Sequence, residues 1–218
     1  MSTLAKVALG MIGHLDAKPL ETSGLSVINL PAPTQHGGLP LMDALRVRGS
    51  QREFLPDALP PQVLSDLLWA AYGVNRPGEH GHTAPTARNA QEIDVYAAMA
   101  DGLYCYEPEP HCLRLVESSD VRRVTGYQDF VDEAPLDLIY VADHGRMKQI
   151  PAAQRDSFAS VAAGAISENV YLYCASAGLA TVIRAWIDRT ALGKAMGLPP
   201  DGQILLSQTV GYPARKNP

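Results

Sequence analysis

Apolar residues recur along this chain with two different periods, and the period separates the expected helices from the expected strands. Spacings of three and four residues predict helices over 40–47, 60–73, 156–178 and 191–196. Alternation or short apolar runs predict strands over 92–99, 103–106, 113–116, 134–142, 179–187 and 203–210. A polar helical segment is expected over 119–132.

The turns between the middle strands indicate how those strands pair. Asp101-Gly102 is a tight hairpin signal, and two prolines within 107–110 mark a second turn. The strands from 92 to 116 therefore form an antiparallel meander. The run 134–142 is too apolar for an edge position, so we expect it inside the sheet.

The first 39 residues differ from the rest of the chain. Prolines and glycines punctuate residues 17–39 around one apolar island, Leu25–Leu30, which predicts an extended arm packed on a single domain that spans residues 40–218. The apolar run Val7–Ile12 is shorter than the core of a secretory signal, and three cysteines are too few for a disulfide framework. We expect a cytoplasmic protein, with a periplasmic one after signal removal as the alternative.

The predicted helix 156–178 is unusually rich in alanine, glycine and serine. Small side chains let the helix backbone approach its neighbours closely. We therefore expect this helix in a tight core or at a subunit interface.

Composition limits the classes of function. The 218 residues are 46% hydrophobic and 19% charged, as in a globular protein with a full core. A net charge of −5 leaves no basic surplus for a nucleic-acid backbone, and no run reaches the ~18 apolar residues of a membrane helix. We expect neither nucleic-acid nor membrane binding, and any bound phosphate should belong to a small molecule.

The stretch 46–52 carries the clearest candidate chemistry. Arg48, Ser50 and Arg52 fall at alternate positions, so in an extended segment all three side chains project to one side. Guanidinium groups bind phosphate oxygens bidentately, and the Ser50 hydroxyl and the Gly49 N–H add neutral donors. The pattern favours a phosphate site. A solvated basic turn and a set of structural ion pairs are the alternatives.

A second polar stretch, residues 85–91, combines small side chains with the amides of Asn89 and Gln91. Each amide offers a donor and an acceptor on one planar group, which suits the edge of a pyrimidine-like ring.

Two groups of residues suggest a metal site only weakly. His80 and His82 stand two apart, and Cys105 and Cys112, with His111 beside the second, flank a turn. Neither group has the three or four placed ligands that zinc requires, so no metal is predicted.

Five blocks of the sequence, in order, resemble the motifs of the nitroreductase family of FMN-dependent oxidoreductases, and they lean toward the short branch that includes the SagB-type dehydrogenases. The blocks are Arg48–Arg52, Leu68–Gly73, Ala84–Gln91, Asn169–Leu172 with Ala177–Thr181, and Val210–Pro213. The resemblance runs from about residue 41 to 213. It implies an α+β fold with a mostly antiparallel sheet flanked by helices, in an obligate homodimer with two FMN sites at the subunit interface.

The resemblance also implies roles for particular residues. One subunit would hold the FMN phosphate and the pyrimidine side of the ring with Arg48, Gly49, Ser50 and Arg52, and the other subunit would supply Pro85, Thr86, Ala87 and Asn89. Gln128 would lie against the polar edge of the ring, the backbone of Arg184 and Ala185 would face flavin N5, and Arg215 or Lys216 would complete the phosphate site. The chain departs from the family pattern at Gly49, Thr86 and Arg88.

The implied activity is hydride transfer from NADH or NADPH through flavin N5 to a small acceptor, such as a nitroaromatic compound or a quinone. No nucleophile or catalytic triad is expected, because the cofactor carries the chemistry. A dinucleotide fingerprint is absent, and none is needed when the nicotinamide stacks on a flavin. A SagB-like oxidase that aromatises azolines in a peptide, and a flavin-binding module without turnover, are the alternatives.

Overall fold

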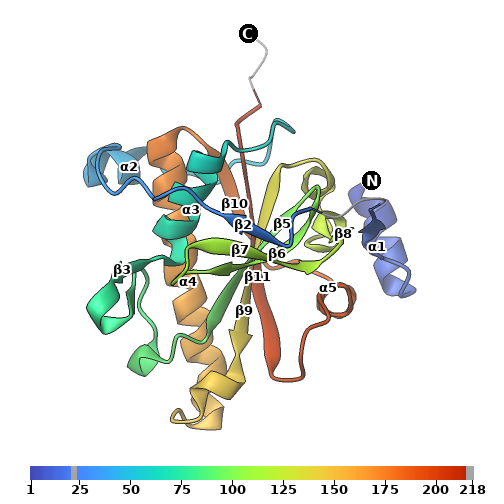
Figure 1. Cartoon of the computed structure of the whole chain (residues 1–218). Coiled ribbons are helices and arrows are strands. Elements are labelled where there is room, and N and C mark those ends of the chain that lie inside the picture. The colour runs from blue at the N-terminus through green and yellow to red at the C-terminus, as the bar shows by residue number, and fades with distance from the viewer. Residues whose placement is uncertain (21–23, 215–218) are drawn as a thin grey trace.

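A seven-stranded antiparallel sheet forms the centre of the computed structural model, which describes residues 1–20 and 24–214 (Figure 1). The strand order is β10 (Ala180–Arg184), β11 (Gly202–Gly211), β9 (Leu136–Asp143), β5 (Ile93–Met99), β6 (Gly102–Glu107), β7 (Cys112–Glu117) and β2 (Val27–Asn29). Two short pairs lie outside it: β1 (Lys18–Pro19) with β8 (Ser119–Asp120), and β3 (Val74–Arg76) with β4 (Gly81–His82).

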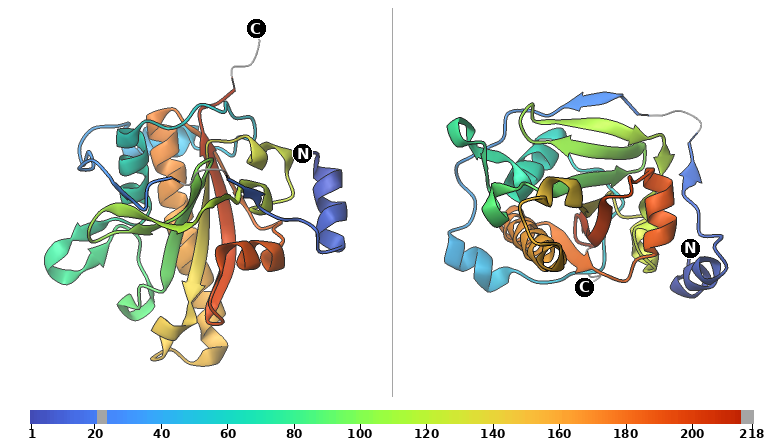
Figure 2. Two further views of the ribbon diagram at one scale, coloured as in Figure 1. Left: turned by 45° about the vertical axis from the view of Figure 1, so that its right-hand side comes forward. Right: turned by 90° about the horizontal axis from the view of Figure 1, so that it is seen from below.

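Helices flank the sheet on both sides (Figure 2). The long helix α4 (Ala152–Ala177) packs against α3 (Pro61–Tyr72) and α2 (Leu41–Val47), while α5 (Arg189–Met196) lies on the opposite side with α1 (Thr3–Met11) beyond it. This arrangement confirms the expected α+β class with a mostly antiparallel sheet. Within the described residues, no helix has the length and apolar character needed to cross a membrane.

Strand β9 joins two hydrophobic cores. Neighbouring side chains on a strand point to opposite faces. Leu138 and Tyr140 accordingly lie in the core under α3 and α4, and Ile139 and Val141 lie in the core that α5 covers. Burial on both faces explains why the five consecutive residues 138–142 are apolar, and the place of β9 between β11 and β5 confirms the predicted interior strand.

The N-terminal residues are more structured than an extended arm. The apolar island was expected only to pack on the rest of the chain, and it does so as a strand: β2 pairs with β7 through Ile28 and Leu113. The helix α1 was not predicted, because its own apolar run is weak. Contacts with the rest of the chain hold it in place instead, among them the hydrogen bond of the buried Lys6 to Gln128 O and its ion pair with Asp132.

The predicted helix over 119–132 is wrong. The structure has β8 there, followed by the 3₁₀ turns η3 (Arg122–Val124) and η4 (Asp129–Asp132). Aspartate side chains bond to the local backbone in place of a helical ladder: Asp120 accepts from Arg122 N at 3.1 Å and Asp129 from Phe130 N at 3.0 Å. The remaining 3₁₀ turns are η1 (Pro77–Glu79), η2 (Ala87–Asn89) and η5 (His144–Met147).

Candidate functional site

The segment 48–55 runs beside β10 and the C-terminal end of β11. Gln51 N donates to Thr181 O at 3.0 Å, and Leu55 N donates to Tyr212 O at 2.9 Å. These backbone bonds fix the path of the segment and leave its polar side chains available for other partners.

Tyr171, from α4, organises the start of this segment. Its hydroxyl oxygen accepts from Ile183 N at 3.0 Å and lies 2.8 Å from Ser50 Oγ. Because a phenol oxygen can accept one bond while its own proton is donated to another partner, both contacts form together. The Arg48 guanidinium carbon lies 5.2 Å from the centroid of the same ring, as in a cation–π pair. Two of the three predicted phosphate ligands therefore meet at one aromatic side chain.

Gly49 and Arg52 line two adjoining cavities that share Gln51 and Pro213. The cavity at Gly49 measures about 180 Å³ and the cavity at Arg52 about 490 Å³. Within residues 1–20 and 24–214, neither Arg48 nor Arg52 forms an ion pair with a carboxylate. The alternative of structural ion pairs at these arginines therefore finds no support in the part of the chain that the structure describes.

A row of side chains joins Arg52 to the loop that carries Gln128. The rings of Phe54 and Phe130 lie 5.4 Å apart, and the Arg184 guanidinium carbon lies 5.9 Å from the Phe130 ring. Arg52, Phe54 and Phe130 also line one cavity. Three stretches that are far apart in the sequence, around residues 52, 128 and 184, thus meet in one region.

Gln128 holds a polar atom without a partner. The residue precedes η4, yet its side chain makes no capping hydrogen bond, and its Oε1 is buried with no hydrogen-bond donor among the described residues. An unpaired buried acceptor costs about 1–3 kcal/mol. A Cβ added at Gly126 would lie 2.6 Å from this oxygen, so glycine leaves the space that the amide needs.

The Arg184 side chain points into the protein. It forms an ion pair with Asp137 at 2.6 Å and donates to Thr125 O at 2.8 Å. Burial lowers the pKa of the Arg184 guanidinium and raises the pKa of the Asp137 carboxyl, and in both groups the attraction between the two charges acts in the opposite direction. The Arg184 guanidinium group therefore makes its contacts inside the protein and does not face a ligand. What this stretch offers to a ligand is its backbone and the exposed Ala185.

The second predicted set of ligands lies near the other end of α4. Arg88 donates to Gln149 O at 3.4 Å, just before α4 begins, whereas Ser50 contacts Tyr171. From Ala152 to Tyr171 the helix rises over 19 residues, or roughly 28 Å. Within one chain, the Arg88 end of this loop therefore lies far from Ser50, whereas the carbonyl of Thr83, two residues before Pro85, accepts a hydrogen bond from Asn169 at 3.3 Å. The residues of this second set are Pro85, Thr86, Ala87 and Asn89.

The loop that carries this second set has an unusual backbone. Arg88, Asn89 and Gln91 have φ values of 55°, 52° and 50°, in the left-handed region that non-glycine residues seldom adopt. Gln91 stabilises the loop by donating from its backbone to Thr86 Oγ1 at 3.1 Å and from its side chain to His80 O at 2.5 Å. Such strain concentrates at functional sites.

Some expected ligands are used elsewhere or lie outside the description. His80 contacts Glu109, His82 contacts the Tyr72 carbonyl, and no three His, Cys, Asp or Glu side chains among the described residues gather as metal ligands. Arg215 and Lys216 lie outside the described residues.

A model of the nitroreductase family matches residues 45–212, which is more than three quarters of the chain. The chain belongs to the nitroreductase family. A protein of Ralstonia eutropha JMP134 that is named as a nitroreductase has a crystal structure with a TM-score of 0.88 and 50% identity, over 92% of this chain and 95% of that one. A protein of Methanocaldococcus jannaschii that carries the same name is 31% identical over 153 residues, 65% of this chain and 76% of that protein.

Two more distant solved structures share the nitroreductase fold. The NADPH:FMN oxidoreductase of Vibrio harveyi, in complex with NAD+, has a TM-score of 0.60 and 15% identity over 80% of this chain and 69% of that one. The Escherichia coli microcin synthetase complex McbBCD, with truncated pro-MccB17 bound, has a TM-score of 0.69 and 18% identity over 96% of this chain and 82% of that one. At these identities the likeness shows the fold alone.

Sequence reasoning missed two residues of this candidate site. Tyr171 lies in one of the matching blocks, but its neighbours in the helix gave no sign that its hydroxyl would meet Ser50. Phe130 fell in the segment that was wrongly predicted as a helix. For both residues, the partners are distant in the sequence.

Proposed function

We propose that this nitroreductase-family protein is an FMN-dependent oxidoreductase that passes hydride from NADH or NADPH to a small acceptor, such as a nitroaromatic compound or a quinone. One observation carries the proposal. Arg48 and Arg52 have no carboxylate partner among the described residues, and Arg52 lines one cavity with Asp129 and Phe130, the residues that directly follow Gln128 and its unpaired amide oxygen. FMN has a phosphate for the arginines and a ring edge with an N–H donor for the amide.

The phosphate end of the site is built from charged and neutral donors. Arg48 and Arg52 supply guanidinium forks, and Ser50 supplies a hydroxyl whose direction Tyr171 controls. Gly49 has no side chain, so a phosphate can approach its N–H closely.

The ring end is built from an amide and from main chain. Gln128 would accept a hydrogen bond from the ring edge, and the backbone at Arg184 and Ala185 would face the reactive nitrogen. When bound, FMN supplies hydride acceptance and donation at N5, while the chain supplies orientation and electrostatics. Polar donors near a ring that becomes negative on reduction stabilise the reduced form.

A second copy of the chain would complete the site. Large apolar side chains stay exposed on α2 and α4, among them Met42 (75% exposed) and Val161 (70% exposed), as at a surface that another chain covers. We propose a homodimer in which the 85–89 loop of one chain faces the Arg48 segment of the other. This arrangement accounts for the distance between the Arg88 end of the loop and Ser50 within one chain.

All three cysteines are free thiols, Cys105, Cys112 and Cys174. A chain with this many unpaired thiols suits a reducing compartment, so we propose a cytoplasmic location.

The test is the visible absorption spectrum of the purified protein, recorded anaerobically before and after addition of NADH or NADPH. We expect two flavin bands that bleach with one of the nucleotides. Flavin bands that neither nucleotide bleaches would favour one of the two alternatives, a flavin-binding module without turnover or an azoline oxidase. A colourless protein that FMN does not reconstitute would overturn the proposal.

A further inference from the structure

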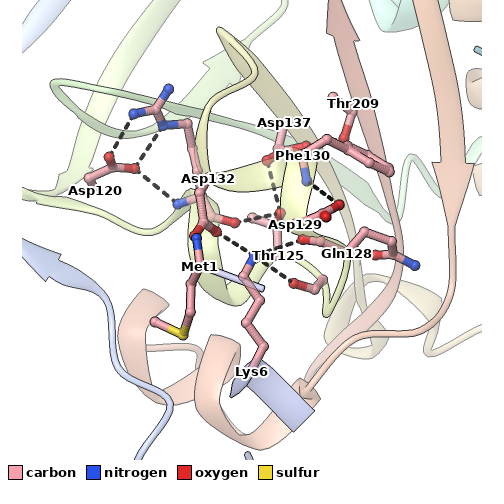
Figure 3. A network of polar contacts seen from close by, with 12 residues as sticks. Met1, Lys6, Asp120, Thr125, Gln128, Asp129, Phe130, Asp132, Asp137 and Thr209 are labelled. Atoms are coloured by element: carbon pink, nitrogen blue, oxygen red, sulfur yellow. Dashed lines mark hydrogen bonds and ion pairs between the residues drawn. The ribbon is translucent and has the colours of Figure 1, made fainter. Parts of the chain in front are cut away.

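Lys6 of α1 is a fully buried lysine, and all of its polar partners lie in the loop that carries Gln128 (Figure 3). Its Nζ donates to Gln128 O at 2.7 Å and to Gly126 O at 3.5 Å. The same ammonium group forms an ion pair with Asp132. The Lys6 side chain therefore contacts Gly126, Gln128 and Asp132, three residues of the same loop.

This burial is costly unless the contacts are kept. An ammonium group removed from water loses several kcal/mol of solvation, which only close and well-oriented acceptors offset. Burial lowers the pKa of Lys6, and the Asp132 carboxylate acts in the opposite direction. The Lys6 contacts consequently constrain α1 and the loop together.

Other contacts hold the neighbouring residues of this loop: Arg184 donates to Thr125 O at 2.8 Å, and Tyr127 N donates to Trp186 O at 3.3 Å. Among the side chains of the described residues, however, only Lys6 donates a hydrogen bond to the Gln128 carbonyl, and the Gln128 side chain does not cap η4. Helix α1 also approaches the preceding residue closely, since a Cβ at Gly10 would lie 2.8 Å from the Tyr127 hydroxyl. The position of the Gln128 backbone thus depends on a helix that lies outside the predicted domain boundary.

We infer that Lys6 is a positioning residue for the flavin site: its ammonium group fixes the Gln128 backbone so that the buried amide oxygen faces the polar edge of the bound ring. This inference rests on the proposed function. Its competitor is a purely structural role, in which Lys6 stabilises the fold and has no particular relation to Gln128.

A double-mutant cycle on FMN affinity separates the two roles. The variants are Lys6→Met, which keeps most of the side-chain length, Gln128→Ala and the combination, titrated with FMN by the quenching of flavin fluorescence. We expect Lys6→Met to raise the Kd about tenfold in the wild-type background and less than about twofold in the Gln128→Ala background. An equal effect in both backgrounds, or no effect of Lys6→Met, would overturn the inference.

Lys194→Met is the matched control. Lys194 also contacts the N-terminal segment, through Asp16 at 3.7 Å, but it is exposed and lies in α5. We expect its FMN Kd to be unchanged. If Lys6→Met does not fold, Lys6→Leu, which also lacks an N–H donor for the Gln128 carbonyl, enters the same cycle with the same two outcomes. A wild-type protein that binds no FMN would overturn the proposed function and this inference together.

Discussion

The hydroxyl of Tyr171 lies 2.8 Å from the hydroxyl of Ser50 and accepts a hydrogen bond from the backbone of β10. Strand β10 leads directly to Arg184 and Ala185, the stretch proposed to face the reactive nitrogen of the flavin. One phenol group on α4 therefore ties together the phosphate end and the ring end of the proposed site.

Removal of that hydroxyl should weaken cofactor binding. Tyr171→Phe keeps the ring under Arg48 but loses two hydrogen bonds, and a typical bond contributes about 1 kcal/mol. We expect the FMN Kd to rise about fivefold to tenfold in a fluorescence titration. Tyr173→Phe, whose hydroxyl makes only a 3.4 Å contact with Val63 O, should leave it unchanged. Equal effects of the two substitutions would refute this role for Tyr171.

Arg48 should act on the phosphate alone. Arg48→Ala removes a charge-assisted contact worth about 1.5–3 kcal/mol, so FMN should bind about tenfold to a hundredfold more weakly, while riboflavin, which has no phosphate, should bind as before. Arg46→Ala is the control, because Arg46 is exposed and pairs with Asp43 on α2. Parallel losses for FMN and riboflavin would show that Arg48 supports the fold instead of the phosphate.

The sequence predicted the site better where neighbours in the chain carry the chemistry than where tertiary contacts do. The alternation of Arg48, Ser50 and Arg52 was readable, and so were the meander and the interior strand, because period and turn chemistry are local. The 119–132 segment was not, because its aspartates compete with the helical backbone. Helix α1 was not predicted because the contacts that stabilise it are not local. Lys6, within the helix, contacts Gln128, which lies more than 100 residues later in the sequence.

Glu92 should make stability depend on pH. Its carboxyl group is buried, neither oxygen has a hydrogen-bond partner among the described residues, and burial raises its pKa. The folded protein then keeps a proton that the unfolded chain has released, so stability falls as pH rises from the unfolded pKa through the folded one.

Glu92→Gln removes this dependence because an amide does not titrate. We expect urea unfolding to give similar stabilities for the variant and the wild type near pH 4, and a more stable variant near pH 8. The exposed Glu133→Gln should follow the wild type at both pH values. A constant difference between Glu92→Gln and the wild type would contradict the raised pKa.

Replacing either partner of the buried pair Arg184–Asp137 should lower the free energy of unfolding, and replacing both should lower it by less than the two single losses added together. Either Arg184→Leu or Asp137→Leu leaves one buried charge without its partner, at a cost of about 3–5 kcal/mol. The double variant should lose clearly less than the sum of the two single losses in urea unfolding. Additive losses would mean that the two side chains stabilise the fold independently.

The proposal that two chains build each flavin site is tested most directly with hybrid dimers. One variant, Arg48→Ala with Arg52→Ala, removes the phosphate ligands, and the other, Pro85→Trp, places an indole at the exposed loop of the second set. Each variant alone should bind FMN poorly. An equimolar mixture, unfolded and refolded together, should regain intact sites in the hybrid dimers, about one quarter of all sites. A mixture that binds no more FMN than the separate variants would contradict the shared site.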